Sequence, residues 1–214
     1  MFKKALLAAT LVATPVLASA ATVSAINDYT LALAEVDQNQ SLALPGVWTA
    51  APRTVNPDAS ISGAFRSPFQ TDGENSAGYY TVGGGSQYVG TSNPAELALN
   101  SLSKSISLLW GSPDRYNTLE LFNGINLVAT ILGSQFNVIA LEASFVTISA
   151  DSASEYFDTV RFTSQNGSGN AVNAFEFANV TVAPVPVPAG LPLILTALGG
   201  IAYLSRRKQQ KNNA

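Results

Sequence analysis

The sequence contains no cysteine and no histidine. These absences exclude a disulfide framework, any Cys or His nucleophile-and-base pair, and the usual ligand sets of zinc, haem and iron–sulfur clusters. We therefore expect no cofactor, and any bound metal ion would take oxygen ligands. An exported chain can still do without disulfides, because a core of roughly 150 residues buries enough surface to be stable.

Charged residues are also scarce, at 12% of the 214 residues, about half the usual share. Six of the 11 basic residues lie close to the two ends of the chain, which leaves five of them with all 14 acidic residues in between. The central segment thus carries a net charge of −9. Because phosphate contacts need clustered Lys and Arg, we expect no nucleic-acid partner.

The N-terminal residues have the layout of a secretory signal peptide. Lys3 and Lys4 precede an apolar stretch over 5–16, and Ala18 and Ala20 form an A-x-A cleavage site. An N-terminal membrane anchor is the alternative, but the apolar stretch is short for one. We predict a signal peptide over residues 1–20, so that the secretion machinery exports the chain.

A second apolar run covers residues 189–204 near the other end. Its 16 residues are at the short edge of the roughly 17–25 that span a membrane. Arg206, Arg207 and Lys208 follow it and can reach the interface. By the positive-inside rule they place the basic tail, 206–211, in the cytoplasm and the rest of the chain outside. We predict a transmembrane helix that anchors the chain in the inner membrane.

A proline-rich box precedes this run, formed by Val185, Pro186, Val187, Pro188, Ala189 and Gly190. Residues 184–214 as a whole resemble the VPLPA variant of the PEP-CTERM sorting signal of bacterial envelope proteins, with Val187 where that pattern has Leu. The resemblance implies an exosortase, a membrane-embedded protease or transpeptidase, as a partner. A plain C-terminal anchor is the alternative, although such an anchor needs no proline box.

Residues 21–183 show short alternating apolar segments punctuated by Gly, Asn, Ser and Pro, which is typical of an all-β sandwich or barrel. We predict one jelly-roll-like β-sandwich. The expected strands are 29–36, 60–66, 78–82, 105–110, 118–123, 125–132, 136–141, 145–150, 156–163 and 172–182. Residues 97–102 follow a possible helix start at Asn93-Pro94 and fit either a helix or a strand.

Two local irregularities are also predicted within the body. Asn123-Gly124 is a signal for a type I′ hairpin turn, since both residues tolerate positive φ. The apolar positions change parity between Phe177 and Val180, which indicates a β-bulge near Asn179.

Two further segments of the body resemble a recurring pattern in exosortase-dependent surface proteins. In that pattern Trp110-Gly111-Ser112 leads through Tyr116-Asn117 to a strand, and the strand of Phe175-Glu176-Phe177 closes the domain before the sorting tail. The resemblance implies a class of surface protein and no reaction.

No acidic residue lies in a catalytic motif, so we predict that the chain is not an enzyme. Glu120 and Glu142 alternate with leucines and are expected to face solvent, and Asp114 lies in a proline-containing turn, where a structural role is expected. A small glycoside hydrolase is a lesser alternative, which would need two acids roughly 5 to 10 Å apart in one cleft.

Two kinds of binding site remain open. A structural calcium ion could take oxygen ligands from Asp72, Glu74, Asp158 and Glu176, although no EF-hand is present. A sugar could stack on exposed tyrosines, for which the candidates are Tyr79, Tyr80 and Tyr116. Because Tyr79 and Tyr80 are adjacent in a strand, one ring should be exposed. Trp110 ends an apolar run and should lie in the core.

These observations together predict an exported bacterial protein of the envelope or extracellular matrix. Its body would be periplasmic or at the cell surface, anchored in the membrane before processing and then surface-attached or secreted. The alternative is a carbohydrate-binding module for exopolysaccharide.

Overall fold

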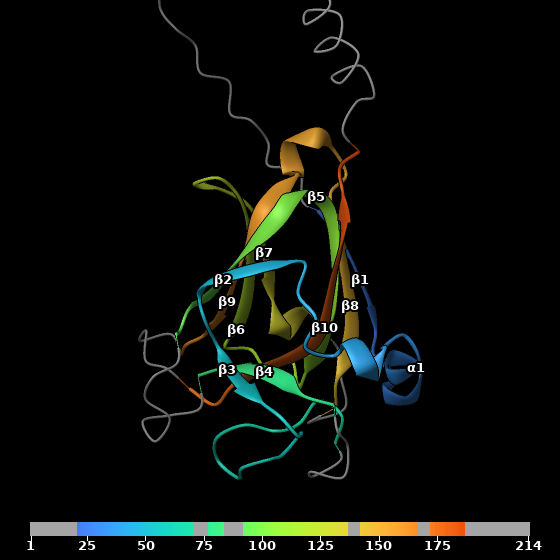
Figure 1. The fold of residues 1–214 in the computed structure, drawn as a ribbon, viewed down its shortest axis with the longest axis vertical. Helices are drawn as coiled ribbons and strands as arrows, with labels where there is room; N and C mark the ends of the chain where they lie inside the picture. Colours follow the sequence, from blue (N-terminus) through green and yellow to red (C-terminus); the bar gives the residue numbers. More distant parts are fainter. Residues whose placement is uncertain (1–20, 71–76, 84–91, 137–141, 167–171, 187–214) are drawn as a thin grey trace, which may run out of the picture.

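The computed structural model describes residues 21–70, 77–83, 92–136, 142–166 and 172–186 (Figure 1). The described residues form one antiparallel sheet of ten strands, which confirms the predicted all-β class. The strands are β1 (Thr22–Ile26), β2 (Gly46–Ala50), β3 (Arg53–Val55), β4 (Tyr79–Val82), β5 (Ala95–Gly111), β6 (Asn117–Asn123), β7 (Asn126–Leu132), β8 (Ser144–Ser149), β9 (Phe157–Ser164) and β10 (Phe175–Pro184). The helices are α1 (Tyr29–Ala34) and the short 3-10 helices η1 (Gln38–Gln40), η2 (Gly133–Gln135) and η3 (Ala153–Glu155).

The long strand β5 organises the sheet. Its first half, 95–99, pairs with β2 and β9, whereas its second half, 103–111, pairs with β8 and β10 and meets β9 only at Ser103. The sheet therefore has two arms that share β5. The first arm has the order β2-β5-β9-β6-β7, and the second has the order β1-β8-β5-β10-β4-β3.

The two arms pack against each other through an aromatic core. Phe162 of β9 stacks on Phe177 of β10 with 4.1 Å between ring centroids, although these two strands share no ladder hydrogen bonds. Trp48 of β2 likewise meets the edge of Tyr80 of β4 at 5.3 Å. Trp110 is fully buried, as predicted, and stacks on Phe175.

The other face of the second arm is covered as well. A second apolar cluster forms there between the strands, helix α1 and the segment 59–69, with Phe65, Phe69, Tyr79 and Leu109 among its members. β4 and the first half of β10 are thus buried on both faces, whereas most of β1 is exposed.

The predicted strand at 29–36 is wrong, because this segment forms helix α1. The Asp28 side chain accepts a hydrogen bond from the Leu31 amide at 3.0 Å and caps the helix. Ala32 is buried while Leu31 is 59% exposed. An apolar alternation of this length fits one turn and a half of helix as well as a strand, and the cap favours the helix.

The predicted strand at 60–66 is also wrong. Ile61 and Phe65 form an isolated bridge around a tight turn, in which Gly63 has a φ of +74°. A glycine accepts this left-handed conformation at little cost, so the chain reverses where a strand was expected. This turn becomes one wall of the pocket described below.

Asn93-Pro94 does not start a helix, so of the two predictions for 97–102 the strand is confirmed. The Asn93 side chain donates to the Ser164 carbonyl at 2.7 Å and accepts from the Ser164 amide at 3.1 Å. These bonds attach the segment to β9, and β5 begins at Ala95.

The remaining strand predictions agree with the structure within a few residues, except at 105–110, which is part of the longer strand β5, and at 136–141. There Phe136 follows η2, and residues 137–141 lie outside the described chain. The hairpin after 118–123 is confirmed, but its turn is not type I′ at Asn123-Gly124. Asn123 pairs with Asn126, so Gly124 and Ile125 are the central residues, and only Gly124 has a positive φ, at 56°. This is the pattern of a type II′ turn.

The β-bulge near Asn179 is confirmed. The register of β10 on β5 shifts between Ala178 and Thr181, and Asn179 has a φ of 53°. Its backbone amide donates to the Ser41 carbonyl at 2.8 Å, and its side-chain amide donates to the Asp37 carbonyl at 3.2 Å. The bulge therefore holds the segment around η1 against β10.

Asn179→Ala is expected to lower the free energy of unfolding by about 2 kcal/mol. Alanine pays roughly 1 kcal/mol for the left-handed conformation, and a buried hydrogen bond worth about 1 kcal/mol is lost. Asn179→Gly loses only the hydrogen bond, so its loss should be about half as large. Urea unfolding of the three proteins measures both effects, and an alanine variant as stable as the original chain would contradict this account.

Candidate functional site

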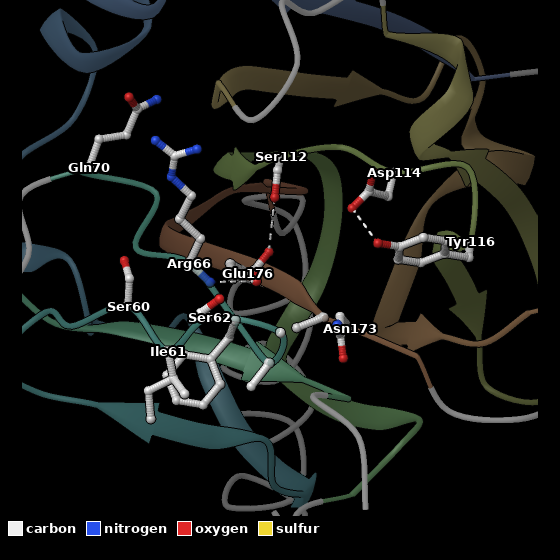
Figure 2. Close-up of a pocket in the computed structure, with 14 residues that line it drawn as sticks. Ser60, Ile61, Ser62, Arg66, Gln70, Ser112, Asp114, Tyr116, Asn173 and Glu176 are labelled. Carbon is white, nitrogen blue, oxygen red and sulfur yellow. Dashed lines mark hydrogen bonds between the residues drawn. The ribbon is translucent and has the colours of Figure 1, made fainter.

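A pocket with a cavity volume of about 610 Å³ lies at one end of the body. Its walls come from the 60–70 segment, the loop that follows β5 and the chain entering β10 (Figure 2). The polar side chains in its lining include Ser60, Arg66, Gln70, Asp114, Tyr116 and Asn173. A volume of this size falls within the roughly 300–1,000 Å³ of small-molecule sites.

Glu176 is the most buried acid of the pocket, with 2% of its surface exposed. One carboxyl oxygen accepts a hydrogen bond from the Arg66 backbone amide at 2.9 Å, and the other accepts from the Ser112 hydroxyl at 3.3 Å (Figure 2). Burial raises the pKa of Glu176 from 4.5 to about 8, against the opposing effect of these hydrogen bonds. The side chain is therefore largely neutral at pH 7.

The position of Glu176 depends on a glycine in the neighbouring strand. Gly111 pairs with Glu176, and a Cβ atom on Gly111 would lie 3.0 Å from the Cβ atoms of both Glu176 and Pro68. That distance is shorter than ordinary van der Waals contact. The missing side chain lets the 60–70 segment approach the sheet closely enough to cover the carboxyl group.

Asp114 and Tyr116 form a second polar unit in the pocket. The Tyr116 hydroxyl donates to the Asp114 carboxylate at 2.7 Å. Burial and this carboxylate raise the pKa of the Tyr116 hydroxyl, so the hydroxyl group stays protonated. The Asp114 carbonyl also accepts a hydrogen bond from the Asn117 amide at 2.9 Å. Asp114 therefore lies in a turn, as predicted.

Two residues of the lining have backbone conformations that non-glycine residues seldom adopt. Ser112 has a φ of 35° and Gln70 has a φ of 55°. Each such conformation costs of the order of 1–3 kcal/mol and persists only when the surrounding structure holds it. At Ser112 it directs the hydroxyl group toward Glu176.

The tyrosines predicted to bind sugar do not form one site. Tyr79 and Tyr80 are 0% and 6% exposed, so the expectation that one of their rings is exposed is wrong. The reason is that both faces of β4 are covered: Tyr79 packs against Phe65, and Tyr80 packs against Trp48 and Phe177. Of the three candidates, only Tyr116 lines the pocket.

The candidate calcium ligands are not gathered in one place either. Asp72 and Glu74 lie outside the described residues, and Asp158 accepts hydrogen bonds from the Gly124 amide at the β6–β7 turn. Glu176 pairs opposite Gly111 on β5, whereas Phe157, next to Asp158, pairs opposite Ser103.

These two positions on β5 are about 26 Å apart at roughly 3.3 Å per residue, so Asp158 and Glu176 cannot share one ion. Within the described chain no group of three or more acidic side chains is placed to hold a metal ion.

The structure brings Asp114 and Glu176 to one pocket, a pairing that sequence reasoning missed. Glu120 is elsewhere, partly exposed and 3.8 Å from Arg161 in an ion pair, and Glu142 is partly exposed. One sequence signal was available for Glu176. It alternates with Phe175 and Phe177, which face the aromatic core, so it had to face the opposite side of the sheet.

The predicted sorting features are mostly beyond the described residues. Val185 still donates to the Leu102 carbonyl at 2.8 Å, and Pro186 is exposed. The signal peptide, 1–20, with its cleavage site at Ala18 and Ala20, and the whole of 187–214 lie outside. None of the helices that the structure does describe is long and apolar enough to cross a membrane.

Comparison with family models, with curated proteins and with solved structures finds no match to this chain. Function is therefore inferred from the pocket and from the sequence features at the two ends.

Proposed function

We propose that this chain is an exported bacterial surface protein of the envelope or extracellular matrix, without catalytic activity. An exosortase would recognise residues 184–214 in the inner membrane and release or attach the body. The signal peptide, the proline box, the short apolar run and the basic tail support this proposal. We also propose that the two arms of the sheet form a jelly-roll-like sandwich.

One structural observation favours the proposal above others, namely the positions of the ends of the body. Thr22 of β1 pairs with Ser149 of β8, which pairs with Ser105 of β5, which pairs with Ala183 of β10. The beginning and the end of the body therefore lie in one row across the sheet.

The pocket lies at the other end of β10, where Glu176 pairs with Gly111. Gly111 lies six positions after Ser105 on β5, which corresponds to about 20 Å at roughly 3.3 Å per residue. A body held at the membrane by its C-terminal segment would present this pocket outward.

The sorting part of the proposal is tested by changing the proline box. Replacing Pro186 and Pro188 together by alanine is expected to leave a full-length chain in the inner membrane. The unchanged chain should lose its tail and move to the surface or the medium. Intact mass and cell fractionation measure both results. An identical, unprocessed C-terminus in both chains would refute sorting by an exosortase.

Saccharide binding is the second candidate function, and the pocket is the observation that favours it. Its lining offers hydroxyl, amide and charged groups together with the Tyr116 ring, which are the groups that recognise sugar hydroxyls and sugar faces. Tyr116→Ala should abolish retention of the chain on exopolysaccharide. Tyr156→Ala should not, since Tyr156 is a partly buried tyrosine at the C-terminal end of η3. Equal retention of both variants would remove this candidate.

Glycoside hydrolysis remains the lesser alternative, because Asp114 and Glu176 share the pocket. In a non-catalytic protein, Glu176 acts as a buried hydrogen-bonding group between Arg66 and Ser112. Release of reducing sugar from the bound polysaccharide that disappears in Glu176→Gln would replace our proposal by this alternative.

A further inference from the structure

We propose that the pocket recognises an acidic sugar, whose carboxylate pairs with the guanidinium group of Arg66 while its hydroxyl groups bind the polar lining. This inference rests on the saccharide-binding function proposed above and adds to it the class of sugar.

Arg66 differs from two other arginines of the body in having no ion-pair or aromatic-ring partner for its charge among the residues that the structure describes. Arg161 lies 3.1 Å from Glu96 and 3.8 Å from Glu120, and Arg53 lies over the Phe65 ring. Arg66 is partly buried in the pocket wall and makes no ion pair with any residue that the structure describes. A partly desolvated guanidinium is suited to binding a carboxylate through two parallel hydrogen bonds.

The acids around Arg66 are engaged with other groups. Glu176 accepts from the Arg66 backbone, and the Arg66 side chain runs away from Glu176 toward Gln70 (Figure 2). Asp114 accepts from Tyr116. Asp58 is fully buried and accepts from the Ser67 hydroxyl at 2.8 Å.

Glu142 is a further acid near Arg66. The charges of Glu142, Asp58 and Arg66 all shift the pKa of Tyr29, so all three side chains lie near that tyrosine. It forms no ion pair with Arg66 among the described residues. Within the described chain the Arg66 guanidinium group thus has no carboxylate partner, although acids surround it at longer range.

The rest of the lining supplies groups for sugar hydroxyls. The Ser60 oxygen accepts from the Ser67 amide at 3.0 Å, which leaves its own O–H free to donate. Asn173 is exposed at the rim and offers both an amide donor and a carbonyl acceptor. A uronic acid combines one carboxylate with several hydroxyl groups on one ring. This matches a lining in which one cation, Arg66, lies among hydroxyl and amide groups, and in which the Asp114 carboxylate is hydrogen-bonded to Tyr116.

The test is a calorimetric titration of the purified full-length chain in detergent with glucuronate, galacturonate, glucose, galactose and acetate. We expect a uronate to bind about ten-fold more tightly than its neutral counterpart, because hydrogen bonds between two charged groups are stronger than those between neutral groups. Arg66→Gln should remove this difference, and Arg66→Lys should retain part of it. Arg115→Gln is the control, since Arg115 is an exposed arginine in the loop after β5.

Each outcome decides between the two proposals. Equal binding of uronates and neutral sugars would overturn the inference and leave saccharide binding intact. Binding of acetate as tight as that of uronates would show a carboxylate site without sugar recognition and would also overturn it. Binding of none of the sugars would refute saccharide binding itself. If Arg66→Gln does not fold, the inference is tested by comparing uronate with neutral sugar on the unchanged chain and on Arg66→Lys.

Discussion

Phe177→Ala is expected to lower the free energy of unfolding by about 3–5 kcal/mol, the range found when a buried aromatic ring is removed from a core. Phe177 is fully buried, stacked on Phe162 at 4.1 Å, and near the rings of Tyr80 and Trp48 at 5.6 and 6.1 Å. Its loss would leave a cavity at the place where the two arms of the sheet meet. Denaturant unfolding followed by tryptophan fluorescence measures the change.

Ile125→Ala is the matched control for this experiment. Ile125 is also a large apolar residue, but it is 95% exposed at the tip of the β6–β7 hairpin. Its replacement should change the free energy of unfolding by no more than about 0.5 kcal/mol. A loss below about 1 kcal/mol for Phe177→Ala would mean that the arms do not pack through this ring.

The stability of the body is expected to fall as the pH rises from about 4.5 to about 8. Burial raises the pKa of Glu176 from 4.5 to about 8 in the folded chain. In this window the folded state holds a proton that the unfolded state has released, so raising the pH favours unfolding. The stabilisation by protonated Glu176 is fully present below pH 4.5 and is lost above about pH 8. Between these values the free energy of unfolding falls by up to about 1.4 kcal/mol per pH unit.

Glu176→Gln should remove this slope, because the amide is neutral at every pH and its oxygen can still accept from the Arg66 amide. Urea unfolding at half-unit steps of pH measures the slope for each protein. Glu35→Gln is the control, since Glu35 is an exposed acid at the end of α1 and should leave the slope unchanged. A Glu176→Gln variant with the slope of the original chain would show that another group titrates in this window.

Local features of the body were predictable because they depend on a few neighbouring residues. The β6–β7 hairpin follows from Gly124 between two alternating segments, and the bulge at Asn179 follows from the change of apolar parity in β10. The central residues of the hairpin turn were misplaced by one, since the ladder with β9 and β7 decides where pairing stops.

Features that depend on the layers of the fold were not predictable. Segments 29–36 and 60–66 have apolar patterns compatible with a strand, and a helix cap at Asp28 and a turn at Gly63 decided otherwise. Tyr79 and Tyr80 point to opposite faces as alternation requires. Alternation does not say that both of those faces are covered, so both rings are buried.

By itself the sequence determined what chemistry is excluded, where the charges gather and which sorting signal the C-terminal residues resemble, because each of these depends on residue types and on their order along the chain. Only the tertiary structure decided the pocket. Arg66, Asp114 and Glu176 are far apart in the sequence, and the pairing of Glu176 with Gly111 places them around one cavity. A buried acid that keeps its proton and an arginine that makes no ion pair with any described residue arise from that packing. The acid keeps its proton because burial favours the neutral form of its carboxyl group.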